Sequence, residues 1–205
     1  MGTDAGDDNA RALDRGRGTY QSVITYLAME QPPSAAVGPP PTDNVAIEPW
    51  SDVNVHTYLA LFHRIGDPWL WYGRLQLPRA KIAALLRAPG HHVWRLRVDG
   101  EVVGLCELDR SIPGAVEIAY FGLVPEAAGR GLGSHFLRAM VAEAWGGEAV
   151  RQVWLHTCSE DDPRALMLYQ RVGFRILRRE TEWVQDPRLR GLLPRTAGPH
   201  VPIPE

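Results

Sequence analysis

The chain has 205 residues, of which 45% are hydrophobic and 22% charged, with a formal net charge of −2. This composition predicts a single globular domain with a full-sized core. It gives no support for nucleic-acid binding, because no long basic run occurs, or for a membrane span, because no apolar run is long enough. Residues 1–18 are acidic, polar and glycine-rich, so we expect a disordered N-terminal tail. Because this tail lacks the apolar segment of a signal peptide, we expect a cytoplasmic protein.

The first half of the chain predicts two strands and two helices. Residues 20–29 are rich in β-formers and predict a strand, a proline-rich connector occupies 31–43, and a short strand is expected at 45–49. Residues 52–65 place apolar side chains on one helical face, and a second helix is expected at 77–86, with Pro78 near its start.

The second half predicts a hairpin and then alternating strands and helices. Residues 92–98 and 101–108 flank an Asp-Gly turn, and strands are expected at 116–124, 150–157 and 174–184. One helix begins at Ser134 and another at Asp162-Pro163, the latter ending at Gly173. Residues 186–205 form a proline-rich tail. The order predicts a mixed α/β sheet, antiparallel in its first part, with helices on its faces.

A glycine cluster between strand 116–124 and the following helix is the most informative feature. Gly129, Gly131 and Gly133 would expose backbone N–H groups at a helix N-terminus, where phosphate oxygens are favoured. A P-loop is excluded because no lysine is near. The dinucleotide motif G-x-G-x-x-G is disfavoured, because the third glycine is replaced and an antiparallel hairpin precedes the loop. The pyrophosphate of coenzyme A remains.

Two segments carry a family resemblance. The stretch from Glu117 to Gly133 resembles motif A of the GNAT superfamily, the GCN5-related N-acetyltransferases, except that Ala128 stands where Gln or Arg is usual. Leu155-His156-Thr157, the helix opening at Asp162, and the run LYQRVGF at 168–174 resemble motif B, with Asp162 in place of a frequent Asn. The resemblance covers about residues 45–185.

The resemblance implies the GNAT fold: a mixed, mostly antiparallel twisted sheet of about six to eight strands (an α/β, or α+β, fold), flanked by helices and splayed between its fourth and fifth strands. It implies one acetyltransferase domain over 19–185, with its core at 45–185, and acetyl-CoA as the acyl donor. The implied coenzyme-binding residues are Leu123, Val124, Gly129, Arg130, Gly131, Leu132, Gly133, Ser134, Asp162 and Ala165.

Acyl transfer from a thioester to an amine needs a base, an acid and stabilisation of an oxyanion. By the resemblance, Glu117 is the candidate general base, Tyr169 the candidate general acid, and the backbone N–H of Phe121 lies near the thioester carbonyl. Glu107 on the preceding strand is the alternative base. The competing interpretation makes the two carboxylates ordinary polar strand residues and Tyr169 a packing residue.

The acceptor is less defined. Trp69, Trp71 and Tyr72 are expected to wall its pocket together with Glu107, and a small-molecule amine or a peptide N-terminus fits equally. No metal site is predicted, since the adjacent His91 and His92 lack partner ligands. Cys106 and Cys158 do not form a disulfide framework. The family leaves a homodimer open. The alternative function is an inactive acyl-CoA-binding sensor or interaction module.

Overall fold

The computed structural model describes residues 16–34, 36–147 and 149–205. Most of the predicted N-terminal tail, residues 1–15, lies outside the described residues. The strands are β1 (Thr19–Met29), β2 (Val45–Pro49), β3 (His91–Val98), β4 (Glu101–Asp109), β5 (Ala115–Leu123), β6 (Gln152–Cys158) and β7 (Arg175–Gln185). The α-helices are α1 (Val55–Gly66), α2 (Arg79–Leu85), α3 (Leu132–Trp145) and α4 (Pro163–Val172).

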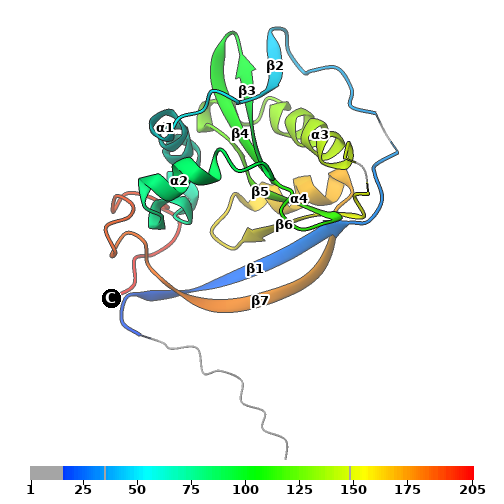
Figure 1. Cartoon of the computed structure of the whole chain (residues 1–205). Coiled ribbons are helices and arrows are strands. Elements are labelled where there is room, and N and C mark those ends of the chain that lie inside the picture. The colour runs from blue at the N-terminus through cyan, green and yellow to red at the C-terminus, as the bar shows by residue number, and fades with distance from the viewer. Residues whose placement is uncertain (1–15, 35, 148) are drawn as a thin grey trace, which may run out of the picture.

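The seven strands form one mixed sheet in the order β2-β3-β4-β5-β6-β1-β7. Every pairing is antiparallel except that of β5 with β6, whose parallel ladder covers only Ala115–Glu117 of β5. Beyond Glu117 the two strands diverge, and Figure 1 shows β1 and β7 lying across the ends of β3 and β4. The splayed mixed sheet predicted from the family resemblance is therefore confirmed, and the splay separates two antiparallel halves.

The first strand in the chain lies in the C-terminal half of the sheet. β1 pairs with β6 through Ile24↔Cys158 and with β7 through Ser22↔Glu182. The next strand, β2, lies at the opposite edge of the sheet, and in the connector between them Pro41 lies against Gly131, the N-cap of α3. Sequence periodicity predicts the strand but not its neighbours, because pairing across 130 residues is a tertiary contact.

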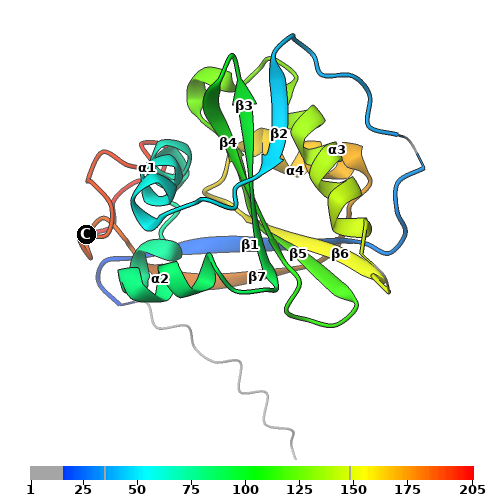
Figure 2. The same ribbon diagram turned by 45° about the horizontal axis from the view of Figure 1, so that its top comes forward.

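Helices cover both faces of the sheet. Figures 1 and 2 show α1 and α2 on one side and α3 and α4 on the other. The apolar faces of α1 and α3 bury Phe62, Ile65, Phe136 and Met140 in one core with Leu96 and Leu105. None of the helices that the described part of the chain contains is long and apolar enough to cross a bilayer.

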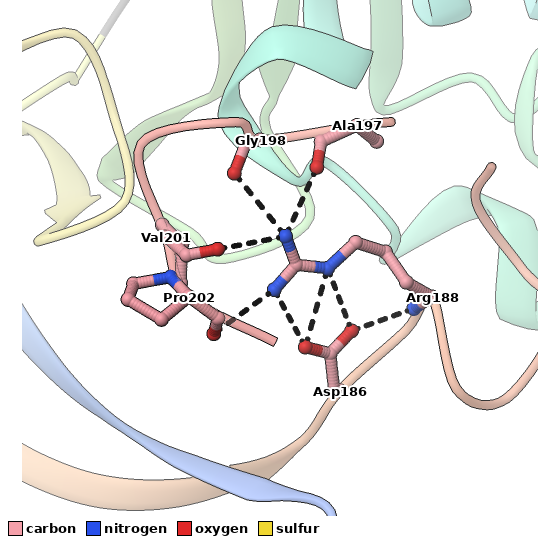
Figure 3. Close-up of polar contacts among 6 residues, drawn as sticks. All are labelled: Asp186, Arg188, Ala197, Gly198, Val201 and Pro202. Carbon is pink, nitrogen blue, oxygen red and sulfur yellow. Dashed lines mark hydrogen bonds and ion pairs between the residues drawn. The ribbon is translucent and has the colours of Figure 1, made fainter. Parts of the chain in front are cut away.

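The C-terminal segment after β7 packs against the body of the protein. Arg188 is 4% exposed, and its guanidinium donates to the Asp186 carboxylate and to the carbonyls of Ala197, Gly198, Val201 and Pro202 (Figure 3). Burial opposes the ionisation of Asp186, but hydrogen bonds from Arg188 outweigh it and hold the pKa of that carboxyl below its usual range. One arginine therefore organises a segment for which the sequence predicts only a proline-rich tail.

This segment supports the loop after α1. Leu193 and Ala197 form a small apolar cluster with Leu70, and the N–H of Gly198 donates to the carbonyl of Asp67. The ring of His200 lies 5.4 Å from that of Trp69. The C-terminal segment thus fixes the loop that carries the aromatic residues predicted to wall the acceptor pocket.

Candidate active site

A cavity of about 1050 Å³ opens where β5 and β6 diverge. At one end it is lined by the loop before α3, and at the other by the loop after α1 together with residues of β1 and β7. Most of the residues singled out from the sequence line it: Glu117, Phe121, Leu123, Gly129, Gly131, Gly133, Ser134, Asp162, Ala165, Tyr169, Trp69, Trp71 and Tyr72. The splay of the sheet therefore brings both sequence motifs and the aromatic segment into one space.

The glycine loop has the backbone geometry of an anion site. Gly129 and Gly131 have φ of +77° and +78°, a region in which L-residues are strained. Gly131 is the N-cap of α3 and provides no side-chain cap, so the first-turn N–H groups of this 14-residue helix, including those of Gly133 and Ser134, are left for a ligand. A Cβ on Gly131 would lie 3.3 Å from Pro41, so Pro41 also limits the space for a side chain at this position of the loop.

Three residues predicted to contact the coenzyme, Leu132, Val124 and Arg130, are not among the residues that line the cavity, unlike the loop glycines. Leu132 is fully buried in the core, so only its backbone is left to face a ligand. The N–H of Val124 already donates to the carbonyl of Val103. Arg130 is exposed and outside the cavity lining.

Asp162 caps α4, accepting from the N–H of Arg164, and its carboxylate forms an ion pair with that side chain at 2.6 Å. The hydrogen bonds from Arg164 are the main reason that the pKa of Asp162 lies below its usual range. Asp162 stands where the family favours Asn, and its charge is balanced by Arg164 in the first turn of α4. Asp162 still lines the cavity.

The Glu117 side chain lies at the fork of the sheet. Glu117 is the last residue of β5 paired with β6, and its side chain is 22% exposed. Nδ1 of His156, on β6, lies 3.6 Å from its carboxylate. The His156 side chain is 40% exposed in the cavity beside Glu117. Nothing local in the sequence indicates this contact, because it depends on the parallel register of two strands.

Tyr169 comes from α4 and faces the cavity from the other side of the fork. Only 7% of the residue is exposed, and within the described residues its hydroxyl has no hydrogen-bond partner. Burial, reinforced by nearby Asp161, raises the pKa of Tyr169 above its usual value. Its phenol is therefore a proton donor rather than a phenolate at neutral pH.

Glu107 lies outside the cavity, although the sequence made it an alternative base and a substrate contact. It is fully buried, and its carboxylate accepts from the hydroxyl of Tyr58 and from Arg74 at 2.6 Å, with Nε2 of His91 at 2.9 Å. Burial disfavours its charge, but His91, Arg74 and Tyr58 together hold its pKa below the usual range. Glu107 instead anchors Arg74, whose guanidinium lies 4.7 Å from the ring of Tyr120 on the cavity wall.

The aromatic segment is locked by tertiary contacts. The ring of Trp71 lies 5.5 Å from that of Phe62 and 5.1 Å from that of Tyr120, and its Nε1 donates to Asp161 at 3.2 Å. Gly122 is required beneath it, since a Cβ there would come within 2.4 Å of Ile65 and 2.9 Å of the Trp71 ring. These contacts hold the indole rigidly at the edge of the acceptor side of the cavity.

Comparisons with known proteins agree with this geometry. The model of the acetyltransferase (GNAT) family matches residues 54–174, more than half of the chain. The chain therefore belongs to the GNAT acetyltransferase family, as the sequence motifs predicted.

A curated relative, the N-alpha-acetyltransferase RimI of Mycobacterium tuberculosis, is 32% identical over 111 residues, which cover 53% of this chain and 62% of that protein. The chain thus matches somewhat less than two thirds of RimI. A GCN5-related N-acetyltransferase from Kribbella flavida has a TM-score of 0.57 at 18% identity, over 85% of this chain and 63% of that one. A GNAT acetyltransferase from Elizabethkingia anophelis with acetyl-CoA bound has a TM-score of 0.50 at 20% identity, over 67% and 80%.

Proposed function

We propose that this protein is an acetyl-CoA-dependent N-acetyltransferase that transfers the acetyl group to a primary amine by direct attack in a ternary complex. The observation that carries the proposal is one continuous cavity that joins an anion-binding glycine loop to a carboxylate and a protonated phenol. Direct attack needs both substrates in one space, and the cavity runs from the loop to the aromatic acceptor side. Bringing the two together in this way removes much of the entropic barrier of a bimolecular step.

At the coenzyme end, the N–H groups of Gly131 to Ser134 would bind the pyrophosphate of the acyl donor, since glycines leave the backbone open to it. The positive end of the α3 dipole would add to this binding. Beyond Glu117, the N–H groups on the β6 side of β5 have no strand partner among the residues that the structure describes, and we assign that of Phe121 to the thioester carbonyl.

At the reaction centre, Glu117 accepts the proton of the attacking amine, directly or through one water, and His156 beside it steadies the carboxylate. Nitrogen bonds to the acetyl carbon, and the carbon–sulfur bond breaks. Tyr169, whose phenol is protonated at neutral pH and lines the cavity, then donates its proton to the departing thiolate.

The acceptor is a small-molecule amine or a peptide N-terminus. The similarity to RimI, an N-alpha-acetyltransferase, supports the second class, and the aromatic wall around Trp71 supports the first. The alternative, an acyl-CoA-binding module without catalysis, would keep the glycine loop but not the chemistry.

A panel of amines and short peptides tests the proposal. Thiol release from acetyl-CoA should rise above the rate without amine for at least one acceptor, and mass spectrometry should show an acetylated product. Tight binding of acetyl-CoA by calorimetry, with no turnover on any amine or peptide, would refute catalysis and favour the binding module.

A further inference from the structure

Three carboxylates gather at the acceptor end of the cavity. Glu160 and Asp161 come from the loop between β6 and α4, and Glu182 comes from β7. Although they are distant in sequence, strand pairing unites them: β1 lies between β6 and β7, and its Ser22 pairs with Glu182 and donates to Glu160 at 2.8 Å. The insertion of the N-terminal strand thus creates this cluster.

No cation within the described residues forms an ion pair with these three carboxylates. Glu160 accepts from the neutral hydroxyls of Ser22 and Ser159, and Asp161 from Thr157, the N–H of Cys158 and Trp71. Among the arginines that line the cavity, Arg74 binds Glu107 and Arg164 binds Asp162, while Arg171 belongs to the last turn of α4. Arg190 donates to the neutral amide of Gln76 and keeps its charge near Tyr72. With three carboxylates against this one arginine, the acceptor end carries a net negative charge.

The neighbouring side chains respond to this negative field. Burial, followed by the charges of Asp161 and Glu160, raises the pKa of the Cys158 thiol to about 12. Burial and then Glu160 raise the pKa of Tyr20, and burial and then Glu182 raise that of Tyr72. The thiol of Cys158 and the phenols of Tyr20 and Tyr72 therefore stay neutral, and they neither add to the negative charge of the carboxylates nor balance it.

Aromatic rings complete the acceptor end. Tyr20, Trp69, Trp71 and Tyr72 line it together with the carboxylates. Carboxylates at the end of an aromatic pocket favour an organic cation, because the rings attract the cation through their faces and replace part of its hydration. An anionic or purely apolar acceptor would leave these carboxylates without compensation.

The cluster is separated from the reaction centre. His156 on β6 contacts Glu117 of β5, and Cys158, beside the carboxylates, lies two residues farther along β6. Ile24 of β1 pairs with Cys158 and Ser22 with Glu182, so Glu182 lies four residues beyond the level of His156 and two strands away from β6. Four strand residues span about 13 Å and two strand spacings about 10 Å, so the backbone of Glu182 is on the order of 15 Å from that of His156. The amine that reacts and the charge that is recognised must therefore be different groups of one acceptor.

Resting on the acetyltransferase function proposed above, we propose that the acceptor is an oligoamine, in which one amine reaches Glu117 while a second, charged ammonium group binds between the aromatic rings and the carboxylates Glu160, Asp161 and Glu182. The reacting amine loses its proton to Glu117 and becomes the amide nitrogen. The distal ammonium keeps its charge throughout and supplies binding and orientation.

Matched acceptors and matched variants test this proposal. Putrescine and spermidine should have a kcat/KM at least about tenfold above that of butylamine, which lacks the second charge, and their advantage should shrink as salt rises. Glu182→Gln should reduce the putrescine-to-butylamine ratio about fivefold. The control is Glu180→Gln on the same strand, whose charge is balanced by Arg178 at 2.7 Å, and it should leave the ratio unchanged.

Calorimetric titration of spermidine into the protein saturated with coenzyme A gives a readout independent of turnover. Salt-dependent binding that Glu182→Gln weakens would support the oligoamine site even if no acetylation occurred, and the catalytic proposal alone would then fail. Efficient acetylation of butylamine or of a neutral peptide, with no preference for putrescine or spermidine, would overturn the oligoamine proposal and leave the catalytic one standing. Glu160→Gln, with folding checked by circular dichroism, provides the second variant.

Discussion

Replacing Tyr169 with phenylalanine separates chemistry from packing. The substitution removes one oxygen from a residue that is 7% exposed and keeps the ring, whose centroid lies 6.2 Å from that of Phe174. The hydroxyl has no hydrogen-bond partner within the described residues, so its loss leaves no other group unsatisfied. Stability should therefore change little, with a Tm shift below about 2 °C.

The effect on turnover should be much larger. A positioned general acid contributes roughly 100-fold or more, which corresponds to about 2.7 kcal/mol of activation free energy. We expect Tyr169→Phe to lower kcat by at least about that factor, with the KM for acetyl-CoA changing less than about threefold, since phosphate binding depends on the distant glycine loop. Stopped-assay thiol release at saturating substrates measures the change.

The matched control is Tyr26→Phe. Tyr26 lies on β1, outside the cavity lining, so the same chemical change should leave kcat within about twofold. Wild-type kcat in Tyr169→Phe would assign Tyr169 to packing and refute its role as the acid. An equal loss in both tyrosine variants would point to a general effect of hydroxyl removal on the fold.

The remaining predictions concern the loop, the base and the C-terminal segment. Gly131→Glu should weaken acetyl-CoA binding about 100-fold or more by calorimetry, because two like charges about 4 Å apart repel by about 4 kcal/mol at partly buried sites. The control is Gly191→Glu, at a similar positive φ with open space around it, which should leave acetyl-CoA binding unchanged. Equal losses of affinity in the two glycine variants would mean that backbone strain rather than charge is responsible. Glu117→Gln should lower kcat/KM about 100-fold with the Tm unchanged, and full activity would transfer the role of base to another group. Arg188→Met should cost about 3–5 kcal/mol of unfolding free energy in urea, because it leaves the Asp186 carboxylate buried without its partner. The pKa of Asp186 is lowered in the fold, so this stabilisation is present above its unfolded value of about 3.9 and is lost as pH falls through the folded pKa; a wild-type advantage that does not shrink on acidification would contradict it.

The sequence by itself determined the local structure and the chemistry of the coenzyme end. Strand and helix periods, the Asp162 cap and the glycines at 129 and 131 depend on residues within a few positions of one another, and the structure has the expected elements there. The order of strands and helices, with the two motifs, was also sufficient to predict the splayed mixed sheet of this family.

Only the tertiary structure decided which side chains share the site. Along the chain Glu107 was the alternative base to Glu117, but Arg74 and His91 pack around Glu107 and bury it. The fork of β5 and β6 leaves Glu117 partly open beside His156. The acidic acceptor end requires β1 to lie between β6 and β7, and these pairings join residues that are 124 or more positions apart. Local propensity carries no information about such contacts, because they depend on how whole elements pack.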